Sequence, residues 1–429
     1  FDWPSDLEPP ECGYSISPHK NKQPLYAGRM LLEPDIDLGL YRVDAVIDWI
    51  AFRMETVSEH QAVNMHRRIM RLLGQIGSRS TCAVYGPKWK MRDRKWKRGY
   101  QGTKFIVQLQ QPEPRELAWL MRELPKQYAV QKQECGLFPI AGIEVSVDFY
   151  PIYDPDHDQA RRDLLRWQMV ELLRRHVKFD PILTESVRGK PRAFHRDARG
   201  KGSSRKTVSV KLAKPNKTLM KEATRLGVPR ATALPLNLRA HTQPPVDWTA
   251  YAGAREFGAM ARIMDKKTDQ KNPLKGTALS LADHEHRARI EMTLKHTKEE
   301  GAVPGGLGLE TARDLFGFRF SEIRKMCFDF HLPTVDAKTL GKKRSPGAGG
   351  FEIEVFKRSG VYGVDLVQRI WNDMERQRCV NHEIAAKPDV LRKKGYLLAY
   401  EPLNRRVKDA LARLTGYWDI RRTGASKAS

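Results

Sequence analysis

The chain has 429 residues, with 76 Lys and Arg against 51 Asp and Glu, so its formal net charge is +25 at pH 7. A protein this basic attracts polyanions, and the phosphate backbone of nucleic acids is the commonest of these. No basic amphipathic helix or lipidation motif is evident, and no apolar run approaches the about 20 residues that cross a membrane. The composition therefore predicts a cytoplasmic nucleic-acid-binding protein, with DNA as its partner and no membrane contact.

The cysteines are few and widely separated. They are Cys12, Cys82, Cys135, Cys327 and Cys379, and none of them forms a Cys-x-x-Cys pair. This spacing argues against a zinc site or a disulfide framework and favours a reducing compartment, in which most of these side chains are buried as small apolar groups.

The first half of the chain alternates between strand and helix patterns. Residues 1–40 are Pro-rich and aperiodic, which is typical of an extended arm. The expected elements then follow in chain order: a strand over Val43–Glu55 with Val46, Asp48, Ile50 and Phe52 on one face, a helix from an N-cap at Ser58 to Leu73, a strand over Tyr100–Gln110, a helix opened by Pro114, a strand over Ile143–Tyr150, and a helix from Asp156 to about His176.

The second half carries further strand patterns and ends in helical ones. The expected strands are Thr207–Leu212, Thr249–Ala252, Gly258–Met264 and Arg289–Lys295, and the expected helices are Glu310–Phe316, Ser321–Phe330, Val364–Arg378 and Leu403–Leu414. The whole pattern predicts an α+β fold: a central, mostly antiparallel sheet built from two half-sheets with helices on one face, plus a small helical C-terminal module. The expected divisions are 1–40 (arm), 41–300 (main domain, with a basic loop at 177–206), 301–332 (helical extension), 333–350 (basic linker) and 351–429 (C-terminal module).

A strongly basic segment lies between the first two strand–helix units. It reads KWKMRDRKWKR, and its candidate DNA-binding residues are Lys88, Trp89, Lys90, Arg92, Arg94, Lys95, Trp96, Lys97 and Arg98. Cations bind phosphates, and indoles stack on bases or pack on sugars, so this mixture suits a loop that binds DNA. The alternative is a solvated connector. A second basic stretch, which contains Gly and Ser, supplies the further candidates Lys201, Arg205 and Lys206. Its alternative is a disordered linker.

The strand IEVSVDFY carries the candidate metal ligands. Its period of two places Glu144, Ser146 and Asp148 on one face and four apolar residues on the other. In the later strand, the same alternation groups Glu291 with Arg289 and Thr293. Carboxylates that converge from neighbouring strands form the hard oxygen site that Mg²⁺ or Mn²⁺ needs for phosphoryl chemistry. The alternative is an ordinary solvated sheet face.

Two histidines, His284 and His286, are spaced like metal ligands but flank a glutamate. The His-hydrophobic-His motif of many DNA nickases needs an apolar residue between them, so these two are interpreted as surface histidines.

Several short segments, in this order, resemble the replication initiation factor family, the trans-acting rolling-circle initiators of plasmids and filamentous phages. They are Ile47-Asp48-Trp49-Ile50 for an Asp-Trp strand, Gly142 to Asp148 for Arg-Ile-Asp-x-x-x-Asp, Tyr251-Ala252-Gly253-Ala254-Arg255 for Tyr-x-Gly-Ser-Arg, Arg262 to Lys266 for Arg-x-Tyr-x-Lys, and Arg289-Ile290-Glu291 for Arg-x-Glu. The second segment has Glu for the first Asp and lacks the preceding Arg. The resemblance covers roughly residues 44–296.

The resemblance implies a metal-dependent DNA nickase that acts on an origin, in single-stranded or hairpin form, with a helicase as a further partner. A tyrosine of such an enzyme attacks a phosphodiester, forms a 5′-phosphotyrosyl link and frees a 3′-OH. On this basis Glu144, Asp148 and Glu291 would hold Mg²⁺ or Mn²⁺, Lys266 and Arg262 would contact the scissile phosphate, and Arg255 would bind DNA.

The nucleophile does not carry over, because Met264 stands where the family has its tyrosine. Three interpretations remain open: Tyr251, the nearest tyrosine in these segments, acts instead; the alignment is displaced; or the protein binds a DNA sequence without cleaving it. An RNA-binding protein is less favoured, because no aromatic ribonucleoprotein motif is present. The sequence leaves the oligomeric state open, a dimer included.

Overall fold

In the computed structural model, the chain is described over residues 13–18, 26–86, 101–130, 137–152, 159–184, 191–196, 202–205, 210–211, 236–237, 249–254, 258–272, 277–296, 308–337, parts of 353–369, and 396–420.

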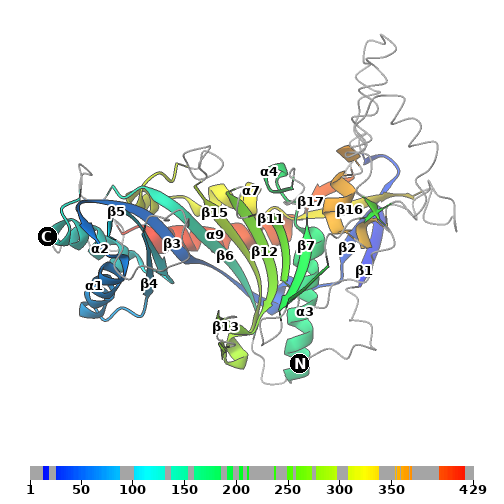
Figure 1. The fold of residues 1–429 in the computed structure, drawn as a ribbon. Coiled ribbons are helices and arrows are strands. Elements are labelled where there is room, and N and C mark those ends of the chain that lie inside the picture. The colour runs from blue at the N-terminus through cyan, green and yellow to red at the C-terminus, as the bar shows by residue number, and fades with distance from the viewer. Residues whose placement is uncertain are drawn as a thin grey trace, which may run out of the picture.

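The centre of the molecule is one antiparallel sheet of nine strands, in the order β4-β5-β3-β6-β15-β12-β11-β7-β8 (Figure 1). The strands are Thr81–Tyr85 (β4), Gly102–Gln110 (β5), Tyr41–His60 (β3), Ile140–Pro151 (β6), Arg287–Lys295 (β15), Ala259–Lys266 (β12), Thr249–Ala254 (β11), Arg192–Arg196 (β7) and Gly202–Arg205 (β8). The first four in this order come from the chain before residue 152, and the other five from the chain after residue 191. They meet where β6 pairs with β15. The predicted α+β fold with an antiparallel sheet made of two half-sheets is confirmed.

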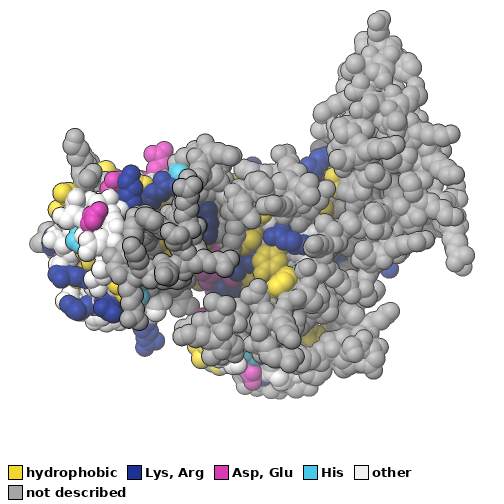
Figure 2. Space-filling model, viewed as in Figure 1, with side chains coloured by type: hydrophobic (Ala, Val, Ile, Leu, Met, Phe, Trp, Pro, Cys, Tyr) yellow, Lys and Arg dark blue, Asp and Glu magenta, His cyan; other side chains and the backbone are white. Residues whose placement is uncertain are grey.

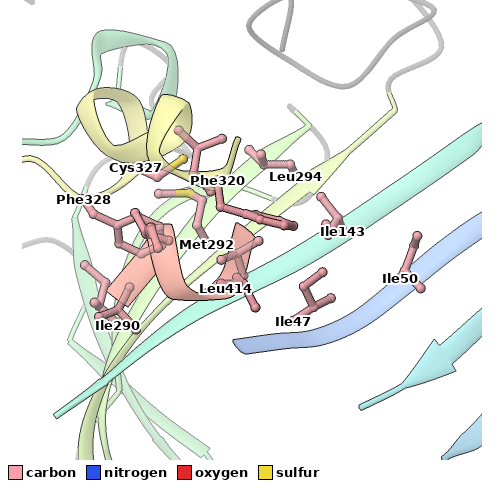
Figure 3. Packing of buried hydrophobic residues seen from close by; sticks show 14 of the residues in the cluster. Ile47, Ile50, Ile143, Ile290, Met292, Leu294, Phe320, Cys327, Phe328 and Leu414 are labelled. Atoms are coloured by element: carbon pink, nitrogen blue, oxygen red, sulfur yellow. The ribbon is translucent and has the colours of Figure 1, made fainter. Parts of the chain in front are cut away.

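One face of this sheet is the core of the protein. Ile143, Val145, Val147 and Phe149 of β6 are all 0–1% exposed on this face, as their alternation with polar residues predicts. Figure 3 shows Ile143 on the strand next to β3, which carries Ile47 and Ile50, and it shows Leu414 on a helix. The opposite face carries the polar residues of the same strands.

Helices cover the apolar face. The long ones are α1 (Ala62–Gln75), α2 (Pro114–Gln127), α3 (Gln159–His176) and α9 (Glu401–Trp418), and short turns are added by α4 (Pro181–Thr184), η6 (Ala312–Gly317), η7 (Phe320–Ile323) and α7 (Arg324–Cys327). Their buried residues belong to a single hydrophobic cluster with the sheet. The start of α2 is fixed by Pro114 and by a capping box between Glu113 and Glu116.

The C-terminal helix predicted at Leu403–Leu414 is confirmed as α9. Its apolar stripe, with Leu403, Val407 and Leu411 each 0% exposed, packs against β3 in the main core. Burial against the sheet, rather than helix propensity alone, therefore holds this terminal helix in place. Of the helix predicted over Val364–Arg378, residues 364–366 and 368–369 are helical, and the remainder lies outside the described residues.

A second, four-stranded sheet corrects the expectation of an aperiodic arm. Tyr14–Pro18 (β1) and Arg29–Pro34 (β2) pair with each other, β2 pairs with His331–Asp336 (β16), and β16 pairs with Leu397–Ala399 (β17). Leu32 and Val335 form a small hydrophobic cluster here with residues of the 353–364 region. The partner strand is about 300 residues away in sequence, so no local pattern could reveal this pairing.

Other predicted boundaries differ from the observed ones. Ser58 is not an N-cap, because β3 continues to His60 and α1 begins after Gln61. Of the strand predicted over Thr207–Leu212, Val210–Lys211 (β9) is a strand that pairs with Leu236–Asn237 (β10), and the remainder lies outside the described residues. Thr268–Asn272 (β13) and Thr277–Ser280 (β14) form a further hairpin.

Cys82 and Cys327 are free and buried, as the sequence predicts for most of the cysteines, and the other three lie outside the described residues. Among the helices described here, none is both long enough and apolar enough to span a membrane.

Candidate metal and DNA-cleavage site

A bulge in β3 places Asp48 at the candidate site. The pairing of β3 with β6 is regular up to Ile47 opposite Val145, but the next pair is Trp49 opposite Glu144, so Asp48 is the additional residue. Beyond the bulge the faces are exchanged. Ile50 is therefore buried in the core, and Trp49 shares the polar face. The expectation that Val46, Asp48, Ile50 and Phe52 share one face is thus wrong after Asp48.

Three carboxylates from three adjacent strands converge on this polar face. One oxygen from each of Asp48 (β3), Glu144 (β6) and Glu291 (β15) lies within 4.8 Å of the others. Glu144 is 5% and Glu291 is 3% exposed, and Asp48 is half-buried. Three oxygen donors this close can hold a metal ion. Glu144 and Glu291 therefore converge as predicted.

Asp148 lies on the same face but has a different role from the one predicted. It is 0% exposed and accepts two hydrogen bonds from Arg289, at 2.5 and 2.6 Å, and it forms an ion pair with Arg287 at 3.1 Å. Its negative charge is therefore balanced by two guanidinium groups. Register explains the difference, because Asp148 lies opposite Arg289, whereas Glu291 lies opposite Ser146. Asp48 takes the third place in the acidic cluster.

Two hydroxyl groups orient the cluster carboxylates. The hydroxyl group of Ser146 donates to Asp48, and that of Thr293 donates to Glu144. Both residues lie within the sheet and are 0–3% exposed. Hydrogen bonds of this kind fix the direction of a carboxylate and are typical of the groups around metal ligands.

Two arginines also contact the cluster. Arg262 Nη2 lies 2.8 Å from Glu144 Oε2 and also forms an ion pair with Glu291, while Arg289 Nη1 lies 2.8 Å from Asp48 Oδ1 and 3.4 Å from Glu291 Oε1. Burial alone would lower the pKa of both guanidinium groups, but the nearby carboxylates outweigh burial and raise it. Both arginines therefore remain charged.

The ionised form of Glu291 is nevertheless disfavoured by burial. Burial raises the pKa of Glu291, and the neighbouring Glu144 and Asp48 raise it further, against the opposing effect of Arg262 and Arg289. Burial is the largest of these effects, so the pKa of Glu291 is raised although two arginines lie beside it. The donor set of three carboxylates fits a metal ion.

Tyr251 lies on the same face, further across the sheet. It pairs with Arg262, and Arg262 pairs with Glu291, so the three residues form a row over β11, β12 and β15. The guanidinium of Arg192 lies over the Tyr251 ring at 5.4 Å. Met264, two residues after Arg262 on β12, pairs with Arg289. Lys266, predicted to contact phosphate, forms an ion pair with Asp269 at 3.0 Å.

A cleft of about 520 Å³ reaches the cluster at the edge of the sheet. Strand β5 pairs with β3 only from Trp49 onward, so the first part of β3 leaves its edge open toward α9. Asp48, Tyr150 and Arg287 line the cleft on the side of the sheet, and Arg413 and Tyr417 line it on the side of α9. The cleft thus gives a substrate access to Asp48 from solvent.

Several predicted DNA-binding residues lie outside the described part of the chain: the whole segment from Lys88 to Arg98, Lys201, Lys206 and Arg255. Of Arg205, only its backbone position in β8 is described. His284 lies in an exposed turn, and His286 is 3.8 Å from Asp283, so neither belongs to the metal cluster.

Sequence reasoning missed Asp48 as a ligand, although it named the Asp-Trp segment. The alternation of residues along the strand places Asp48 on the polar face. It gives no sign of the bulge that brings Asp48 beside Glu144. The partner role of Arg289 was also missed, and the Arg-x-Glu spacing within one strand was the available signal.

Comparisons with protein families, curated proteins and solved structures find no match.

Proposed function

We propose that this protein is a rolling-circle replication initiator or relaxase-like enzyme, which recognises an origin and nicks one DNA strand with a divalent cation and a tyrosine. The observation that carries the proposal is the row from Asp48 to Tyr251: three carboxylates within 4.8 Å of one another, with Arg262 and Tyr251 on the next two strands of the same face. Phosphoryl transfer needs this combination of a metal site, a cation for the phosphate and a nucleophile.

In the proposed reaction, Asp48, Glu144 and Glu291 would hold Mg²⁺ or Mn²⁺, and the cation would supply polarisation of the scissile phosphate. Arg262 and Lys266 then bind the phosphate oxygens that carry the developing charge. The Tyr251 oxygen forms a bond to phosphorus while the bond from phosphorus to the 3′-oxygen breaks. The phenol loses its proton, and the 3′-oxygen gains one, so the products are a 5′-phosphotyrosyl link and a free 3′-OH.

Tyr150 is a weaker candidate for the nucleophile, although it lines the cleft. Its ring lies 4.5 Å from the guanidinium of Arg42 and 5.4 Å from that of Arg287, and its hydroxyl donates to Asp148 at 3.4 Å. Burial, followed by the charge of Asp148, raises the pKa of Tyr150 to about 12. A phenol that resists ionisation is a poor nucleophile near neutral pH.

A second candidate function is a sequence-specific DNA-binding protein that no longer cleaves. The ion pairs of Arg262 with Glu144 and Glu291 favour it, because they occupy the oxygens that a cation would use. Met264 at the family's tyrosine position favours it too. Both candidates share the scaffold and the DNA, and they differ only in chemistry.

The DNA-binding part of the proposal draws on the basic segment from Lys88 to Arg98. Replacing Lys88, Lys90, Arg94 and Lys97 by Ala is expected to flatten the slope of log K against log salt by up to about four contacts' worth, or about 3.6. An unchanged slope would identify the segment as a solvated connector.

The test of cleavage compares the wild type, Tyr251→Phe and Met264→Tyr on 3′-end-labelled single-stranded DNA with Mn²⁺. Tyr85→Phe is the matched control, because Tyr85 is 53% exposed on the edge strand β4. Loss of the covalent adduct in Tyr251→Phe alone supports the proposal. An adduct in Met264→Tyr alone identifies the natural protein as a non-cleaving binder, and no adduct from any variant counts against the family resemblance.

A further inference from the structure

A basic site, separate from the acidic cluster, lies on α1, beyond the end of β3 that is remote from Asp48. The exposed residues Asn64, Arg67, Arg68 and Arg71 follow the i, i+3, i+4, i+7 spacing and therefore form one stripe along the helix. Helix α1 has no acidic residue. Figure 2 shows Lys and Arg side chains gathered at this end of the molecule.

The stripe borders a cleft of about 590 Å³. Besides the three arginines, Gln101, Gln127 and Glu59 contribute to its lining, so it has three permanent positive charges and one negative charge. Arg68 donates to the side-chain amide of Gln127. Among the residues described, neither Arg67 nor Arg71 has an acidic partner. These two guanidinium groups are thus available to an anionic ligand.

The other side of α1 is not available to a ligand. Met65, Ile69 and Leu73 are 0–1% exposed and pack in the main core. An amphipathic helix that binds a lipid surface must expose its apolar face, and α1 cannot do so without leaving the sheet. The ligand must therefore bind through charge and hydrogen bonds alone.

Arginine together with neutral amides is the combination that binds a phosphate backbone. Guanidinium groups form paired hydrogen bonds to phosphate oxygens, and amide side chains bind phosphate or sugar without reading the bases. Gly86 lies beside the start of α1, where its added Cβ would be 3.7 Å from the Cβ of Ala62, and Gln101 lines the cleft. The sequence between them contains the basic segment from Lys88 to Arg98.

We propose that the α1 cleft binds the phosphate backbone of duplex DNA, at a distance from the nicking site. The inference rests on the DNA-binding part of the proposed function. Asp48 lies at the nicking site and His60 at the α1 cleft, and β3 joins them (Figure 1). Twelve residues at about 3.3 Å each span roughly 40 Å. At about 3.4 Å per base pair this corresponds to roughly 12 base pairs, or about one turn of the duplex.

The experiment uses the full-length protein and hairpin DNA whose duplex arm is lengthened from 6 to 20 base pairs beside a single-stranded segment. The wild type is expected to gain affinity once the arm exceeds about 12 base pairs. The variant Arg67→Gln, Arg68→Gln and Arg71→Gln is expected to lack this gain. Its slope of log K against log salt should be lower by about 2.7, so that between 50 and 200 mM salt the wild type loses about 40-fold more affinity than the variant.

Two controls separate a binding role from an effect on folding or on total charge. The variant Arg67→Lys, Arg68→Lys and Arg71→Lys keeps the charge and is expected to keep most of the salt slope. A matched variant removes three exposed arginines elsewhere: Arg313→Gln, Arg319→Gln and Arg405→Gln. It is expected to keep the gain with arm length.

An equal gain with arm length in the wild type and in the α1 variant would overturn the inference. So would an equal loss in the matched control, or a loss of binding to phosphatidylserine vesicles without any loss of binding to DNA. The nicking proposal fails separately: if the wild type forms no adduct but the α1 variant still loses the arm-length dependence, only the chemistry is wrong.

Discussion

Asp48 and Asp148, which both line the cleft, are expected to respond in opposite ways to neutralisation. Asp148 is buried between Arg289 and Arg287, and removing one partner of a buried ion pair costs about 3–5 kcal/mol. Because Arg289 keeps its contacts with Asp48 and Glu291, Asp148→Asn should lower the free energy of unfolding by about 3 kcal/mol, the lower end of this range. The same variant should bind Mn²⁺ almost as well as the wild type does.

Asp48→Asn should show the reverse. Its carboxylate is partly exposed, and the Arg289 it contacts remains paired with Asp148, so the loss of stability should be about 1 kcal/mol. Removing one of three charged ligands should weaken Mn²⁺ binding about tenfold or more. Urea unfolding at pH 7 without metal and calorimetric titration with Mn²⁺ measure the two effects. A stable Asp148→Asn protein that loses Mn²⁺ as completely as Asp48→Asn would refute this division of roles.

Three further outcomes are expected. Tyr251→Phe should abolish the covalent adduct and change DNA affinity less than twofold, as measured by fluorescence anisotropy; a large loss of affinity would show that Tyr251 binds DNA instead. Burial lowers the pKa of His176 to about 4, so between about pH 6.5 and pH 4 the native protein binds fewer protons than the unfolded chain. The free energy of unfolding should therefore fall by about 3 kcal/mol as the pH falls through this range. Thermal melts in which His176→Asn shows the same fall would contradict this expectation. Gly253→Ala should destabilise the protein by about 1–3 kcal/mol, because Gly253 has φ +78° and an added Cβ would collide with the backbone oxygen of Ala259. An unchanged melting temperature would show that β11 can shift.

Much of the sheet could be predicted because its strands are buried on one face. In IEVSVDFY, alternation correctly separated Glu144, Ser146 and Asp148 from the core residues, and the grouping of Arg289, Glu291 and Thr293 was correct as well. What alternation cannot give is the register between strands. Register decided that Asp148 meets Arg289 and that Glu291 approaches Glu144.

Two other features escaped prediction for different physical reasons. The bulge at Asp48 adds one residue to a strand whose sequence reads as regular, so only the pairing with β6 reveals it. The strands β1 and β2 depend on a partner some 300 residues later. By contrast, the spacing of Arg67, Arg68 and Arg71 does predict a basic stripe on α1, so the expectation that the chain has no basic amphipathic helix is wrong.

The proposed function requires that Tyr251, on the acidic face of the sheet, form a covalent link to DNA. The most direct test incubates the protein and Mn²⁺ with a pool of 3′-end-labelled single-stranded DNA of random sequence, and then maps any modified residue by mass spectrometry. Labelled protein is expected only when Mn²⁺ is present, with the nucleotide on Tyr251, and no labelled protein is expected from Asp48→Asn. Binding of both Mn²⁺ and DNA without an adduct on any tyrosine would contradict the proposed function.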